Sequence, residues 1–187
     1  MRTASLVGIL LAAVAVGCAK PTAIHVPIAP PSTPLTDLRA GLSSPVAEVR
    51  RESAWALAGV RKADRDLIVS IERLLDDPVQ EVRYAGAWVL GHVSSGRYFD
   101  AAPVPEIVRP DYPLEAFRKQ ITGTVLLEVL VGEVGEIAHA EVRESIPELD
   151  AAALACVHRW KFSPARRHDR AVAALVQVPL SFAMVNR

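Results

Sequence analysis

Apolar residues recur with helical spacing in the first half of the chain and with strand-like spacing in the second half. Two apolar helical segments, 42–60 and 75–93, each follow a shorter one, at about 35–42 and 65–75. From residue 111 the pattern predicts one helix, two strands, a second helix and a final strand. We therefore predict an α+β chain, with an all-α part followed by a small αββαβ domain.

The two longer helical segments are copies of each other at a constant offset of 33 residues. LSSPVAEVRRESAWALAGV aligns with LDDPVQEVRYAGAWVLGHV, with ten identical positions. Ser44 in the first copy and Asp77 in the second are predicted helix caps, each followed by proline at the first helical position. Trp55 and Trp88 are expected in the core. Because such units bury their apolar faces only by stacking, the pair is expected to lean on the C-terminal domain or on a partner.

The repeat resembles a known family of helical repeats. The pattern Asp-Pro-x-x-x-Val-Arg is clearest in the second copy and is similar to HEAT repeats of the short type. Residues 35–95 are therefore predicted to form a HEAT-like repeat domain. The resemblance implies either a binding surface or a structural spacer, because repeats of this kind carry no chemistry of their own.

The N-terminal segment MRTASLVGILLAAVAVGC has the features of an export signal. A positive charge near its start precedes an apolar run that is too short to span a bilayer, and a small residue precedes Cys18. The end of the segment resembles the lipobox of bacterial lipoproteins, which implies removal of residues 1–17 and lipidation of Cys18. Ordinary cleavage, with Cys18 unmodified, is the alternative.

Two proline-rich stretches are predicted to be connectors, a tether at 18–34 and a linker at 96–110. Ala19 would be the second residue of the mature chain, and its identity resembles that of lipoproteins sorted to the outer membrane. We therefore expect a lipid-anchored protein in the periplasm, at the outer membrane rather than the inner membrane.

Charge and composition exclude several function classes. The 21 basic and 21 acidic residues give no net charge, so we expect no nucleic-acid partner. The stretch CVHRWKFSPARRH contains Cys156 and His158, but they lie about 200° apart around the predicted helix and cannot share a metal or substrate. No metalloprotease, nucleophile-elbow or phosphate-loop motif is present. We predict no catalytic residue, metal site or cofactor, and hence no enzyme.

Motifs from about 103 to 185 follow the order of the TonB C-terminal domain family. "YP" opens a helix, and GTVLLEVLV, a glycine-containing hairpin, LDAAALACVHRWKFSPA and VQVPLSF come after it. The resemblance implies a TonB C-terminal-like domain at 111–187, with protein partners and a link to TonB-type transmembrane transport. The family commonly has a glycine before the last strand, where this chain has RHDRAV, so the form of that turn stays open.

The connections predict a three-stranded antiparallel sheet in the order second, first, last, with the last strand at an edge. Pro179 supports an edge position, because proline cannot donate to a ladder. If Pro179 points outward, the free backbone groups belong to Ala173, Leu175 and Gln177, which would accept an extended peptide by strand addition. In the TonB family the last strand similarly pairs with the N-terminal segment of outer-membrane transporters. The alternatives are a protected edge, a homodimer contact or a structural domain that touches the cell wall.

Overall fold

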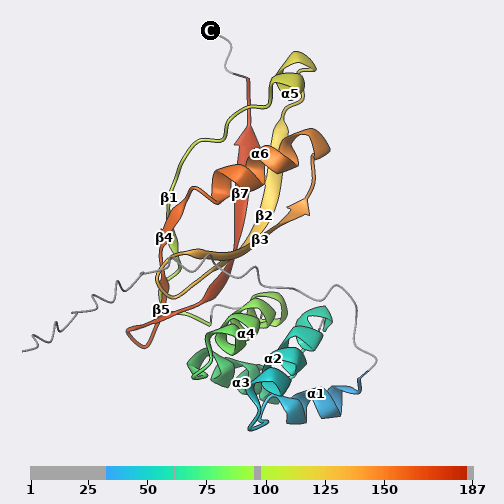
Figure 1. Cartoon of the computed structure of the whole chain (residues 1–187), viewed down its shortest axis with the longest axis vertical. Helices are drawn as coiled ribbons and strands as arrows, with labels where there is room; N and C mark the ends of the chain where they lie inside the picture. Colours follow the sequence, from blue (N-terminus) through green and yellow to red (C-terminus); the bar gives the residue numbers. More distant parts are fainter. Residues whose placement is uncertain (1–32, 61, 95–97, 185–187) are drawn as a thin grey trace, which may run out of the picture.

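The computed structural model describes residues 33–60, 62–94 and 98–184. It has a helical module at one end and a sheet domain at the other (Figure 1). The predicted signal peptide, Cys18 and the tether up to residue 32 lie outside the described residues. No helix in the described part of the chain is long and apolar enough to cross a membrane.

The helical module contains two copies of a short helix followed by a longer one, as the repeat predicts. Trp55 and Trp88 occupy equivalent positions in the longer helices, and both are buried in one core with ring centroids 6.1 Å apart. The elements of the module are α1 (Leu35–Gly41), α2 (Ala47–Ala56), η1 (Leu57–Gly59), α3 (Arg65–Glu72), η2 (Arg73–Asp76) and α4 (Gln80–Val93).

The two predicted cap residues bind the turn before each longer helix and not the helix itself. Both longer helices begin two residues after the proline, and the residue between is extended. Ser44 Oγ accepts the Val46 N–H at 3.2 Å, and Asp77 Oδ1 accepts the Val79 N–H at 3.0 Å. These side chains therefore stabilise the turn that leads into each helix rather than its first turn.

The main sheet of the C-terminal domain has the predicted strand order. Central strand β2 (Gly123–Val131) pairs antiparallel with β3 (Ile137–Glu144) on one side and with β7 (Ala174–Phe182) on the other. Helix α6 (Pro147–Val157) covers one face, and the short α5 (Leu114–Arg118) precedes β2. The apolar residues of that face and of α6 form a single buried cluster.

Four short strands were not predicted. β1 (Val104–Glu106), inside the segment expected to be a linker, pairs with β4 (Lys161–Ser163). β5 (Ala165–Arg167) and β6 (Arg170–Val172) form a hairpin whose turn residues, His168 and Asp169, have φ angles of 48° and 62°. Two consecutive positive φ angles make the tight hairpin turn that matches strand twist. This turn stands where the sequence has no glycine.

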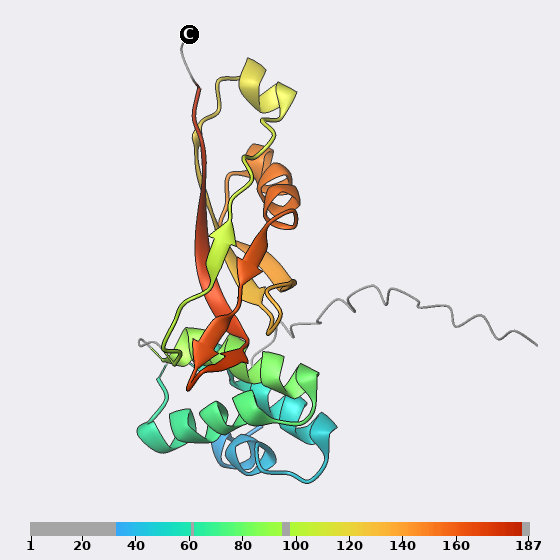
Figure 2. The ribbon, with the colours of Figure 1, turned by 90° about the vertical axis from the view of Figure 1, so that its left-hand side faces the viewer.

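The helical module and the sheet domain share a core. One buried cluster contains most apolar residues of the module together with Leu130, Ala165 and the start of β7. Figures 1 and 2 both place α4 against the end of the sheet where β7 begins. The expectation that the helical pair leans on the C-terminal domain is therefore confirmed.

Candidate functional site

β7 is the more regular of the two edges of the main sheet. It pairs with β2 over nine consecutive residue pairs, from Gly123 and Phe182 to Val131 and Ala174, without a shift in register. The pairing of β3 with β2 is interrupted by two shifts. Since irregular pairing bends and twists an edge, β7 is the better template for an added strand.

The outward backbone groups of β7 belong to its odd-numbered residues. The Leu175 N–H points away from β2, because it donates to the Tyr98 hydroxyl at 3.0 Å. Alternation along a strand places Gln177, Pro179 and Ser181 on the same side, and their side chains are exposed. Within the described residues, the outward N–H groups of Gln177 and Ser181 have no hydrogen-bond partner.

The three predicted edge residues lie in different surroundings. Ala173 precedes β7 and is buried, with only 1% of its surface exposed. Leu175 is half-buried, and its N–H is not free, because Tyr98 binds it. Gln177 is exposed, although its side-chain amide lies 3.5 Å from the Glu128 carboxylate. Peptide binding at these residues stays a prediction.

Tyr98 is the edge residue that the sequence did not reveal. Its hydroxyl accepts the Leu175 N–H and donates to the Ala87 carbonyl of α4, both at 3.0 Å. Burial raises the pKa of this hydroxyl well above its usual range, so it keeps the proton that it donates. Tyr98 lies inside the stretch predicted to be a linker, 96–110, where no periodic pattern marks it.

Helix α4 binds the sheet domain through polar contacts at one end. Arg83 pairs with Glu133, in the turn between β2 and β3, with Nη2 2.9 Å from Oε2. The Tyr84 hydroxyl donates to the carboxylate of Glu136 in the same turn. Each pair joins residues about fifty positions apart, so the two domains are fastened by specific contacts as well as by apolar packing.

Further along α4, a glycine permits close approach to β7. A Cβ placed on Gly91 would lie 2.5 Å from the Leu175 Cβ, closer than two such atoms can be. The equivalent residue of the first copy is Ala58. Trp88 packs edge-on against the His139 ring of β3, at a centroid distance of 5.1 Å. These contacts cover the face of the sheet opposite α6, at the end of the sheet where β7 begins.

A buried carboxylate lies at the same interface. Glu128 in β2 is 4% exposed, and its side chain accepts from His92 Nε2 at 3.1 Å. The other ring nitrogen of His92 lies 2.8 Å from the Trp88 carbonyl oxygen. Since both ring nitrogens face acceptors, the protonated imidazole fits best. The bond to Glu128 raises the pKa of His92, and the same bond holds the pKa of Glu128 below its usual range.

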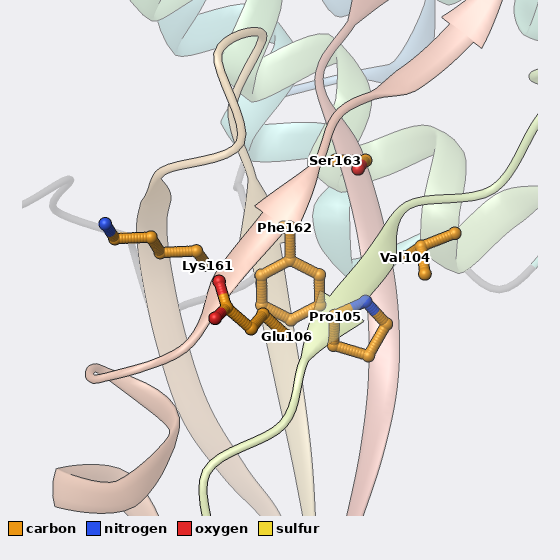
Figure 3. Close-up of a pocket in the computed structure, with 6 residues that line it drawn as sticks. All are labelled: Val104, Pro105, Glu106, Lys161, Phe162 and Ser163. Atoms are coloured by element: carbon orange, nitrogen blue, oxygen red, sulfur yellow. The ribbon is translucent and has the colours of Figure 1, made fainter.

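A pocket of about 310 Å³ lies over β1 and β4 (Figure 3). Figure 3 shows the Phe162 ring beside Pro105, with the Lys161 side chain pointing away from them. The described residues that line it supply one carboxylate, one amine and one hydroxyl, but no histidine or cysteine. We assign no reaction chemistry to this pocket. Its lining residues are Val104, Pro105, Glu106, Lys161, Phe162 and Ser163.

The stretch around Cys156 serves packing. Cys156 is fully buried, and its thiol and the Trp160 indole N–H both donate to the Val108 carbonyl, at 3.2 and 2.8 Å. His158 is exposed just beyond the end of α6. Nowhere in the described part of the chain do three histidine, cysteine or acidic side chains gather as a metal site.

Two arginines at and just after the end of this stretch bind the helical module. Arg167 is half-buried, and its Nη2 lies 2.8 Å from Oε2 of Glu72 in α3. Arg170 similarly reaches Asp76 at 2.7 Å, although that pair is exposed. The β5–β6 hairpin is thus a further attachment between the sheet domain and the helical module.

Comparison with known proteins identifies the class of the sheet domain. Residues 108–184 match the family model described as Gram-negative bacterial TonB protein C-terminal. This region is therefore a TonB C-terminal domain, and it contains the whole three-stranded sheet, α5 and α6.

Two relatives carry TonB names. The chain is 43% identical over 75 residues to protein tonB2 of Pseudomonas aeruginosa, and the aligned region covers 39% of this chain and 28% of that protein. It is 35% identical over 77 residues to protein TonB of Xanthomonas campestris pv. campestris, which covers 40% of this chain and 34% of that protein. The similarity thus spans about a third or less of these relatives' length.

Proposed function

We propose that this chain is a cell-envelope lipoprotein whose C-terminal domain binds extended peptide segments by adding a strand to β7. The partners are proteins, with the N-terminal segments of TonB-dependent outer-membrane transporters as the first candidates. The match of residues 108–184 to a TonB C-terminal domain supports this partner class and a link to TonB-type transport. Lipid on Cys18 would hold the protein in the periplasm at the outer membrane.

One observation carries the proposal. β7 forms an edge whose pairing with β2 has no register shift, and its outward N–H groups at Gln177 and Ser181 have no hydrogen-bond partner in the described part of the chain. A peptide that adds a strand there gains main-chain hydrogen bonds that depend little on its side chains. The opposite edge of the main sheet, β3, is a poorer template because its pairing with β2 has two register shifts. The short strand β1, which pairs with β4, is a poor template too, because Pro105 has no N–H to donate.

The helical module has a supporting role in this proposal. We assign it as a HEAT-like repeat pair that fixes the orientation of the sheet domain relative to the tether. The salt bridge between Arg83 and Glu133 and the close approach of Gly91 to Leu175 support this role, since both hold α4 on the sheet.

Site-specific crosslinking in intact cells tests the proposal. A photo-crosslinkable residue is placed at Ser181, whose side chain is exposed on the edge strand, and a control is placed at the exposed Arg143 of β3. We expect Ser181 to capture a transporter through its extended N-terminal segment and Arg143 not to capture it. Self-adducts at Ser181 would instead support a structural protein that dimerises through β7, and equal labelling at both sites would refute binding at this edge.

A further inference from the structure

The outward side of β7 is divided by Tyr98. Its hydroxyl is bonded on both sides, to the Leu175 N–H and to the Ala87 carbonyl. The side chain is only 7% exposed, so an added strand that reached Leu175 would have to break both bonds and displace a buried ring. That displacement would leave a buried backbone carbonyl without one of its donors, which costs about 1–3 kcal/mol.

Beyond Tyr98 the edge is open over a short length. Gln177 and Ser181 each offer an outward N–H and C=O, whereas Pro179 between them offers only a C=O. Gln177 and Ser181 are four residues apart, or roughly 13 Å along a strand. This length matches about five residues of an added strand.

We propose that Tyr98 determines the register and length of the peptide strand that β7 accepts. The proposal rests on the proposed peptide binding and makes it more specific. The ligand is an extended peptide of about five paired residues that turns away from the sheet where Tyr98 begins. Opposite Pro179, the ligand can donate its N–H but finds no donor for its C=O, which stays in solvent.

The test uses the full chain and two synthetic peptides, of about six and about twelve residues, copied from the segment captured at Ser181. Amide exchange followed by NMR reports Leu175, Gln177 and Ser181 individually, and calorimetry gives the Kd. In the native chain we expect both peptides to protect Gln177 and Ser181 and to bind equally well. In Tyr98→Ala, which removes both the hydroxyl and the ring, the longer peptide should also protect Leu175 and bind roughly 2- to 10-fold tighter than the shorter one.

Two results distinguish this proposal from the proposed function. If the longer peptide already binds tighter than the shorter one in the native chain, or gains no affinity in Tyr98→Ala, the register limit is overturned while edge binding stands. If no segment is captured, or neither peptide protects Gln177 and Ser181, both proposals fail. Tyr112→Ala removes another tyrosine whose hydroxyl donates to a backbone carbonyl, that of Ile121, and should leave the two peptides binding equally well. Native amide shifts in β2 verify that Tyr98→Ala is folded.

Discussion

Arg83 binds Glu133 through the same two nitrogens, Nε and Nη2, with which Arg50 binds Asp77. Each arginine also donates Nη1 to two carbonyl oxygens just before its own helix. Asp77 belongs to the second helical copy, whereas Glu133 belongs to the sheet domain. The sheet domain therefore takes the position that a third repeat would take, which explains how only two copies are stable here.

Loss of the Arg83 to Glu133 pair should loosen the two domains. Both side chains are about one-fifth exposed, so the pair is better shielded than a surface salt bridge. We expect Glu133→Gln to lower the free energy of unfolding by about 1–2 kcal/mol, because Arg83 keeps its charge without its main partner. Urea denaturation of the full chain measures the change.

The matched control is Glu115→Gln in α5. Glu115 pairs with Arg118, but both side chains are more than 60% exposed. This pair should contribute nothing measurable, as is usual at the surface. Equal losses in the two variants would mean that the interface pair has no special role.

Gly91→Ala should destabilise the protein, although alanine is normally the better helix residue. In a helix with free space around the glycine, this change would raise the free energy of unfolding by about 0.5–1 kcal/mol. Here the new Cβ would lie 2.5 Å from that of Leu175, and the overpacking should cost about 1–3 kcal/mol in total. Gly59→Ala is the control, because its Cβ would meet no atom within 4 Å. A stabilising Gly91→Ala would show that α4 does not lie this close to β7.

The contribution of His92 and Glu128 to the stability of the interface should depend on pH. The pKa of His92 is raised above 6.5, so its contribution is complete below about pH 6.5 and is lost as the pH rises through its folded-state pKa. The pKa of Glu128 is lowered below 4.5, so its contribution is complete above about pH 4.5 and is lost as the pH falls through its folded-state pKa. The pair should therefore stabilise most between about pH 4.5 and 6.5.

The alkaline side of this range is the practical test. Urea midpoints measured from about pH 6 to about pH 9 should decline for the native chain and decline less for His92→Gln, which has no charge to lose. His158→Gln, at an exposed site beyond α6, should keep the native decline. An unchanged decline in His92→Gln would place the pH dependence elsewhere.

Much of the architecture could be predicted because it is written in local patterns. The 33-residue repeat predicted two helix pairs, and it placed Trp55 and Trp88 in the core. The strand order followed from the hairpin and the helix that connect the three strands, and Pro179 marked β7 as an edge. These features depend on periodicity and on backbone chemistry, both of which a single sequence displays.

The missed features depend on residues far apart in the chain. Tyr98 and Leu175 are 77 residues apart, and no local pattern connects them. Glu133 looks like an ordinary turn residue until the fold places Arg83 beside it. The β5–β6 turn has positive φ angles at His168 and Asp169. Both residue types tolerate the left-handed region, but unlike glycine they do not indicate it in a sequence.

Cys18→Ala should release the protein from the membrane. If Cys18 carries the lipid, the substitution removes the anchor, and a secreted chain with no lipid should fractionate with the soluble periplasmic proteins. Cell fractionation with mass spectrometry of the mature N-terminus measures both the location and the modification. Cys156→Ala is the control, since that thiol is buried in the sheet domain. Membrane association that survives Cys18→Ala would refute the lipid anchor.

Gln177→Pro separates backbone recognition from side-chain recognition at the edge. The Gln177 N–H points outward, so proline there removes one donor to an added strand without breaking the ladder to β2, as Pro179 already demonstrates. Loss of one main-chain hydrogen bond of about 0.5–1.5 kcal/mol should weaken peptide binding roughly 2- to 10-fold.

Gln177→Ser removes most of the side chain but keeps the N–H, and it should bind as the native chain does. Titration calorimetry with the captured transporter segment compares the three proteins. If the serine variant loses as much affinity as the proline variant, the Gln177 side chain carries the recognition and strand addition at this residue is refuted.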